Sequence, residues 1–185
     1  MARPSSTPRL RELVAQEVGE TVVRAVADHA SSLLLSIDPT CTWSIPDKAN
    51  QLRWTVQLLV GYAQHGLSAT DWPDHGCASG AILDVCTALY SSASNPSFGA
   101  GVLDDLESEV TVNEPVGIVL LAAYARMMCA QRGGRVPVRA LAALAGVDPH
   151  HVRLLGRQGE LEVDDGGVST KNARRWLSAR GLEGL

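Results

Sequence analysis

Aromatic side chains are scarce in this chain. Only 4% of its 185 residues are aromatic, with a single Phe, whereas Ala and Leu are abundant. Strands draw on aromatic and β-branched side chains, and helices on residues such as Ala and Leu. The composition therefore argues against a β-sandwich and predicts a mostly α-helical fold, and the length suits one or two small domains.

Paired cysteines, a leader segment and a membrane-length apolar run are also missing from the sequence. The four cysteines, Cys41, Cys77, Cys86 and Cys129, show no paired spacing. The first eight residues are polar and rich in Pro, unlike a signal peptide. The most apolar run, Val116 to Ala125, is too short to span a bilayer. We therefore expect no membrane segment and a location in the reducing cytoplasm.

Neither sign of charge dominates, and the formal net charge is −4. The two signs are unevenly placed, since residues 1–132 carry 8 Lys/Arg against 14 Asp/Glu and residues 133–185 carry 8 against 6. This balance argues against a basic coat that binds any nucleic acid. An acidic body with a basic end fits binding at defined sites instead.

Helical periodicity fills the first two thirds of the chain. After a tail at residues 1–7, which we expect to be disordered, apolar stripes predict helices over about 8–35, 47–66, 77–92, 102–110 and 115–131. Two glycines at 133–134 mark a boundary. Residues 8–132 are therefore predicted to form a helical bundle.

Two features of this bundle predict a homodimer. The helix at 115–131 is apolar on nearly every face, which is more than a few neighbouring helices readily cover. The first helix carries an apolar stripe from Leu10 to Leu35 with charged residues beside it, as expected of a helix that packs along a partner. The alternative is that both helices close a monomeric bundle.

The last fifty residues contain a sharper pattern. A short apolar helix is predicted from Val138 to Ala145, with Gly146 at its end. Asp148 is placed to cap a second helix, and Pro149 to occupy its first position. Helix, tight turn and helix in this order are typical of a helix-turn-helix.

A hairpin and a third helix are predicted to follow. Gly159 to Val163 is expected to form a strand, and Asp164 to Gly167 a tight turn into the return strand. Ser169 then caps a basic helix with Trp176 and Leu177 on its apolar face.

This order of elements resembles the winged helix-turn-helix of excisionase and MerR-type DNA-binding domains, over residues 135–182. The matching positions are Leu141, Leu144, Gly146, Val147, Val152, Arg153, Arg157 to Leu161, Val168, Trp176 and Leu177. The resemblance implies that Asp148 to Arg157 contact bases in the major groove of double-stranded DNA and that the hairpin contacts its backbone. The hairpin tip departs from the family, because Asp164 and Asp165 stand where such domains often carry Arg.

Seven residues are candidates for DNA contact. They are Arg139, His150, His151, Arg153, Arg157, Lys171 and Arg174. Arg153 and Arg157 are four residues apart on one helix face, and the arginine fork suits guanine or phosphate. For Arg157 the alternative is a surface ion pair with Glu160 or Glu162.

Two residue clusters have the composition of a site without its spacing. One consists of His65, His75, Cys77 and Cys86, which lack the ligand pairs of a zinc site. The other consists of Asp104, Asp105, Glu107 and Glu109, which suit a solvated face better than a catalytic pair. No motif of a phosphate loop or a hydrolase is present either. We therefore expect no enzyme activity, no catalytic residues, and no bound metal or cofactor.

The sequence thus predicts a mostly α-helical protein, with a helical bundle followed by a small C-terminal winged helix-turn-helix. Its expected function is sequence-specific DNA binding as a homodimer, in transcriptional regulation. The rival is a phage- or plasmid-type adaptor or inhibitor whose winged module binds a protein partner. The acidic hairpin tip and the modest basic excess favour this rival.

Overall fold

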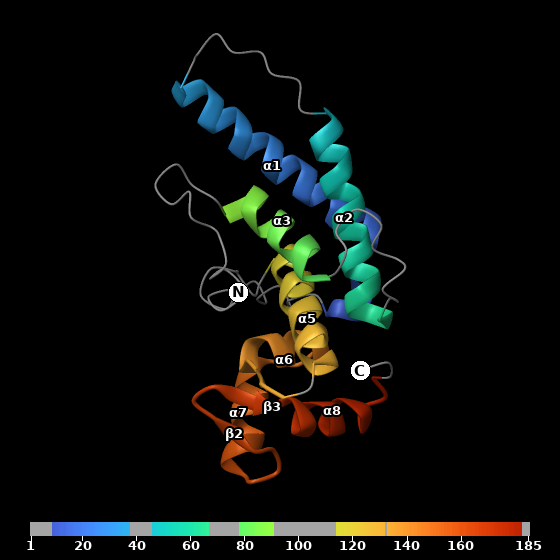
Figure 1. The fold of residues 1–185 in the computed structure, drawn as a ribbon, viewed down its shortest axis with the longest axis vertical. Helices are drawn as coiled ribbons and strands as arrows, with labels where there is room; N and C mark the ends of the chain where they lie inside the picture. The colour runs from blue at the N-terminus through green and yellow to red at the C-terminus, as the bar shows by residue number, and fades with distance from the viewer. Residues whose placement is uncertain (1–8, 38–45, 67–77, 91–113, 132, 183–185) are drawn as a thin grey trace, which may run out of the picture.

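The computed structural model describes residues 9–37, 46–66, 78–90, 114–131 and 133–182. These residues are mostly helical, with a small three-stranded sheet in the C-terminal part (Figure 1). The predicted mostly α-helical class is therefore confirmed. The expected tail at 1–7 and the expected acidic helix at 102–110 lie outside the described residues.

The helical elements that precede the sheet pack around one another. They are the 3-10 turn η1 (Leu10–Glu12) and the helices α1 (Ala15–Ile37), α2 (Pro46–His65), α3 (Ala78–Tyr90) and α5 (Pro115–Ala130). α1 lies against α2, and α3 packs on both (Figure 1). α1 begins later than predicted, because Leu13 has an extended backbone (ψ 127°) that separates η1 from α1.

α5 joins the two ends of the molecule. It contacts η1, α1, α2 and α3 on one side and β1 (Arg135–Val136), α6 (Val138–Ala145) and α8 (Thr170–Ser178) on the other (Figure 1). Every residue from Val116 to Arg126 is buried. Val18 and Val22 of α1 are also buried within the chain. The apolar surface of α5 is thus covered from within, which removes that reason for a homodimer. The later part of the α1 stripe, up to Leu35, lies outside the side chains that the structure describes, so that reason stays a prediction.

A buried arginine ties α5 to the end of α2. Arg126 is 2% exposed, and its guanidinium donates to the carbonyl oxygens of Ala63 at 3.3 Å and Gln64 at 3.5 Å. The last carbonyls of a helix lack partners in the helix itself, so this arginine completes α2. Burial lowers the pKa of Arg126, because desolvation disfavours its charged form. The side chain of Gln64 donates to Leu10 and Leu13, which adds η1 to the same junction.

The C-terminal segment, residues 133–182, contains three strands and three helices. Besides β1, α6 and α8, these are α7 (Pro149–Arg157), β2 (Val163–Asp164) and β3 (Gly167–Ser169). The strands are antiparallel in the order β1-β3-β2, with Val168 opposite both Val136 and Val163. The prediction of a strand over residues 159–163 is wrong except at Val163, where β2 begins.

The error at 159–163 and the missed strand β1 have local causes. The backbone N–H groups of Glu160 and Leu161 both donate to Leu155, so these residues turn back onto the end of α7 instead of extending. β1 has two residues, too few to show periodicity, and it exists because β3 pairs with it. The sheet is therefore decided by pairing across the chain.

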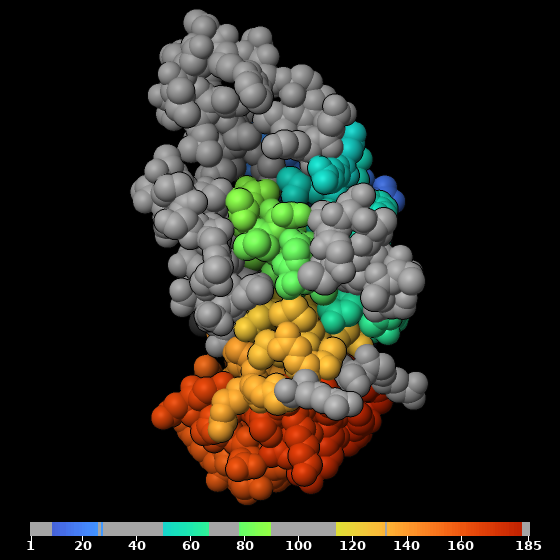
Figure 2. Space-filling model, viewed as in Figure 1, coloured from blue at the N-terminus to red at the C-terminus, as the bar shows by residue number. Residues whose placement is uncertain are grey.

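One hydrophobic core runs through the described residues. Val22, Leu59, Leu121, Leu141 and Leu177 come from five different helices, and each is 0% exposed. Figure 2 shows the C-terminal segment, in orange to red, at one end of the molecule beneath α5 in yellow. The proposed division between 8–132 and 135–182 crosses this continuous core, and it stays a prediction.

Candidate nucleic-acid interface

The turn between α6 and α7 is built by three local signals that the sequence contains. Gly146 ends α6 in the left-handed conformation (φ 65°), which a residue without Cβ adopts at little cost. The carboxylate of Asp148 accepts the backbone N–H of His150 at 2.6 Å and so caps α7, and Pro149 is the first residue of the helix. The predicted cap, turn and helix start are confirmed.

α7 has a buried face and an exposed face. Val152 is 0% and Leu155 8% exposed, and these two side chains anchor the helix to the core. His150, Arg153 and Arg157 are exposed, as predicted. The anchoring pair thus holds the basic residues of α7 toward solvent.

Arg153 and Arg157 form no ion pair among the residues that the structure describes. The alternative for Arg157 required Glu160 or Glu162 as its partner. Glu162 instead accepts a hydrogen bond from the side chain of Asn172 at 2.8 Å. Two arginine forks on one helix face are therefore available to an external group.

Only one of the two carboxylates at the hairpin tip is left without a cationic partner in the described residues. Asp164 forms an ion pair with Arg135 of β1, and it also accepts the backbone N–H of Gly166 at 3.0 Å. Asp165 is exposed. One of the two carboxylates is thus balanced within the sheet, and the other faces solvent.

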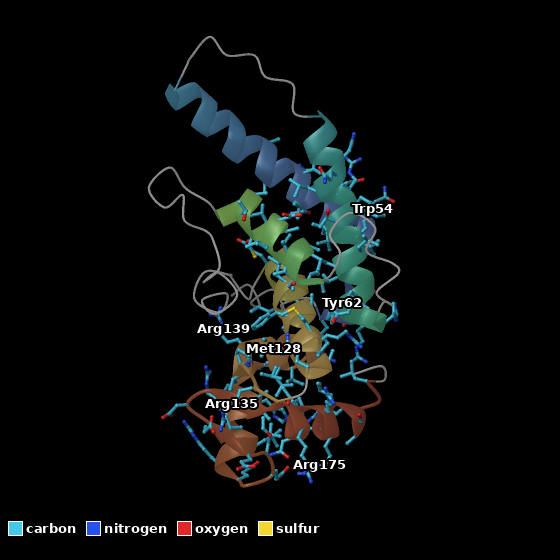
Figure 3. All side chains as sticks on the ribbon, viewed as in Figure 1. Trp54, Tyr62, Met128, Arg135, Arg139 and Arg175 are labelled. Atoms are coloured by element: carbon cyan, nitrogen blue, oxygen red, sulfur yellow. The ribbon has the colours of Figure 1, made fainter. Side chains whose placement is uncertain are left out.

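The exposed basic residues of α8 are Lys171 and Arg175, whereas Lys171 and Arg174 were predicted. Its first turn is capped by Ser169, whose hydroxyl accepts the backbone N–H of Asn172 at 3.4 Å. Lys171 and Arg175 are exposed and four residues apart, and Figure 3 places Arg175 at the outer end of the molecule. Arg175 is absent from the seven predicted contacts. Its spacing of four residues from Lys171 is compatible with one helix face, but Arg174, three residues from Lys171, fits that face as well, so spacing does not separate the two.

Arg174, which the sequence placed at the DNA, points into the molecule. Its guanidinium donates to the backbone oxygens of Cys129 and, at 2.9 Å, Gln131. It therefore ties α8 to the C-terminal end of α5. Adjacent helix residues point about 100° apart, so only one of Arg174 and Arg175 faces outward.

Two other residues predicted to contact DNA, Arg139 and His151, already interact with other parts of the protein. Arg139 on α6 is part-buried and already has an interaction within the protein, and Figure 3 places it beside α6. His151 is part-buried, with its Nε2 at 3.4 Å from a guanidinium nitrogen of Arg180. The exposed basic residues on α7 and α8 that remain candidates for DNA contact are thus His150, Arg153, Arg157, Lys171 and Arg175.

Trp176 packs against the core on the apolar face of α8, as predicted, but it is not fully buried. Its ring is only part-buried, and the guanidinium of Arg180 lies over it at 4.3 Å from the ring centre. Leu177, the next residue, is 0% exposed. Leu177 thus anchors α8, while Trp176 orients Arg180.

The structure brings no metal-binding cluster together within the residues it describes. His75, Cys77 and the carboxylates of residues 104–109 lie outside those residues. Cys86 and Cys129 are buried free thiols, and burial raises their pKa values to about 12 and about 11. Over the described part of the chain, no helix has the length and apolarity needed to cross a bilayer.

We compared the chain with protein-family models, with curated proteins and with solved structures. None of the three comparisons finds a match. The geometry of α7, α8 and the hairpin is therefore the basis for assigning a function.

Proposed function

We propose that this protein binds double-stranded DNA at specific sites and regulates transcription there. In this proposal α6, α7, the β2–β3 hairpin and α8 act as a winged helix-turn-helix. α7 is the helix that enters the major groove.

The observation that carries the proposal is the exposed face of α7. Arg153 and Arg157 lie opposite the buried Val152 and Leu155 and have no ion-pair partner in the described residues. A guanidinium donates two parallel hydrogen bonds to guanine O6 and N7, or to phosphate, so two free forks on one short helix suit a groove. His150, at the helix start, adds a donor or acceptor for a base or a phosphate.

α8 supplies the contacts that do not read sequence. Lys171 and Arg175 are exposed on one edge, where they suit phosphate oxygens. The hairpin is assigned no phosphate contact, because Asp165 faces solvent at its tip and Arg135 is paired with Asp164. Affinity is thus expected from the two helices rather than from the wing.

The proposal includes two protein copies on one DNA site. α7 has nine residues, and a helix of this length reads only a few base pairs. Doubling it on two half-sites supplies the affinity that one copy lacks. We therefore propose a homodimer that forms on DNA, without assigning its interface to α5.

A second candidate function is the docking of a protein partner on the same face. Leu154 follows Arg153 on α7 and is 38% exposed, and Asp165 is exposed on the hairpin. An exposed apolar side chain on a helix that also carries charged residues suits a protein contact with an apolar centre and a polar rim. In a groove the same leucine contacts a thymine methyl group.

Binding of the full chain to a random pool of duplex DNA tests the proposal. We expect one enriched site, an affinity that falls steeply between about 50 and about 200 mM salt, and two chains per duplex. Arg153→Gln is expected to cost about 1–3 kcal/mol at that site, roughly 5- to 150-fold in affinity. Lys171→Gln is expected to weaken all duplexes alike.

Arg24→Gln is the matched control, because Arg24 is exposed on α1. It is expected to keep the wild-type affinity. If no duplex binds at low salt, the protein-docking function takes the place of this proposal. If Arg153→Gln and Arg24→Gln lose affinity equally, α7 is not the reading helix.

A further inference from the structure

A cavity of about 580 Å³ lies where the N-terminal helices meet the C-terminal segment. Four parts of the chain line it: η1 with its neighbours, the end of α2, the turn between α6 and α7, and the residues that follow α8. Its lining side chains include Arg9, Arg11, His65, Leu144, Val147 and Arg180. The volume is in the range of small-molecule sites.

The polar part of this cavity is basic. Three arginines and one histidine line it, and among the lining residues that the structure describes none is an Asp or Glu. Arg9 and Arg11 are exposed, and neither side chain forms an ion pair among the described residues. Glu12 is next to them, and its carboxylate accepts the backbone N–H of Arg9 at 3.1 Å and keeps its negative charge. Three guanidinium groups against one neighbouring carboxylate leave the described part of the cavity with a net positive charge.

The rest of the lining is apolar. Leu10 is 5% and Leu144 2% exposed, and Leu13, Val147 and Leu182 pack against the core beside them. A basic rim above an aliphatic floor favours a molecule with one anionic end and one apolar end. Inorganic anions would use the rim alone.

We propose that this cavity binds a small organic anion with an aliphatic portion, either a carboxylate or a phosphate monoester. The anionic head pairs with the guanidinium groups of Arg9, Arg11 and Arg180, which donate to such oxygens in parallel pairs. The aliphatic part covers Leu13, Val147 and Leu182, which line the cavity and are only part-buried. Binding of such an anion is independent of any DNA activity.

The cavity also touches the two features that position α7. Gly146 and Val147 belong to its lining and form the turn just before the capping residue Asp148. Arg180 is held over Trp176 and lies 3.4 Å from His151 of α7. An anion that pairs with Arg180 changes the charge beside His151. We therefore assign the anion an effector role on α7, a step that rests on the proposed function.

Isothermal titration of the full chain with octanoate, octyl phosphate and 1-octanol tests the site at low salt. We expect at least one of the two anions to bind at least ten-fold more tightly than the alcohol, and the stronger of them identifies the head group. The double variant Arg9→Gln/Arg11→Gln is expected to weaken that anion at least ten-fold. Arg24→Gln, outside the cavity, is expected to leave its binding unchanged.

The site is overturned if neither anion binds, if 1-octanol binds as well as the anions, or if Arg24→Gln weakens the anions as much as the double variant. These results involve no DNA, so they do not depend on the proposed function. The effector role is tested by the DNA affinity with and without the bound anion. An unchanged affinity overturns that role and leaves the site in place, whereas a change of several-fold supports it.

Discussion

At the residue scale, Leu177 is buried more completely than the larger Trp176 next to it, so the leucine is the main anchor of α8 in the core. Leu177 is fully buried, whereas Trp176 is part-buried beneath the guanidinium of Arg180. Leu177→Ala is expected to lower the free energy of unfolding by about 2–5 kcal/mol, because it leaves a cavity in the core. Trp176→Ala is expected to cost less, since it removes a ring that is only part-buried and a cation–π contact worth about 0.5–1 kcal/mol.

Urea denaturation of the two variants beside the wild type measures both losses. The Leu177→Ala midpoint is expected to fall further, with an unchanged dependence on urea. A larger loss for Trp176→Ala would place the tryptophan in the core, as the sequence alone predicted.

The buried thiols give a pH dependence of known sign. Burial raises the pKa of Cys86 from its ordinary 9.0 to about 12, so folding favours the protonated thiol. This stabilising contribution is complete below pH 9 and is lost as the pH rises from 9 toward 12. We expect the free energy of unfolding to fall between about pH 9 and about pH 11, and to fall less in Cys86→Ala. Equal slopes for the two proteins would show that the thiol is accessible to solvent.

At the element scale, the hairpin depends on one of its two glycines. Gly167 has φ 103°, and a Cβ there would collide with the backbone carbonyl of Val136 on β1. Gly166 would meet the side chain of Arg135, which is long enough to move aside. Gly167→Ala is therefore expected to separate β1 from β3. Backbone strain and the steric clash together are expected to lower the free energy of unfolding by about 3 kcal/mol or more.

Gly166→Ala is the matched control and is expected to cost well under half as much. Thermal unfolding followed by circular dichroism compares the two variants. If Gly167→Ala melts like the wild type, then β1 does not pair closely with β3.

At the scale of the whole molecule, α5 makes the two ends depend on each other. It is buried from Val116 to Arg126, and it contacts helices on both sides. The full chain is therefore expected to unfold in one cooperative transition, with coincident curves from circular dichroism and tryptophan fluorescence. Two separate transitions would instead support independent domains at 8–132 and 135–182.

The contacts of α5 with α6 and α8 are lost in a fragment that lacks residues 1–132. Removal of residues 1–132 exposes the faces of α6 and α8 that pack on α5, and it leaves Arg174 without the carbonyl oxygens of Cys129 and Gln131. For this reason the DNA and anion experiments use the full chain.

The sequence by itself determined the features whose signals lie within a few residues of one another. Gly146, Asp148 and Pro149 specify the turn and the start of α7 through their own backbone preferences, and the alternation of Val152 and Leu155 with basic residues specifies its two faces. Composition sufficed for the mostly helical class, since helix formers are abundant and aromatic residues scarce. These are local or averaged properties, so no knowledge of distant contacts was needed.

Only the tertiary structure decided the features that depend on which surfaces meet. The sequence offers no means to choose between Arg174 and Arg175, because the orientation of α8 is set by its contacts with α5 and β1. β1 exists through its pairing with β3, and the basic cavity through four segments that lie as much as 170 residues apart in the chain. The physical reason is that each of these contacts closes a long loop, and the closing partner leaves no mark on the local pattern of residues.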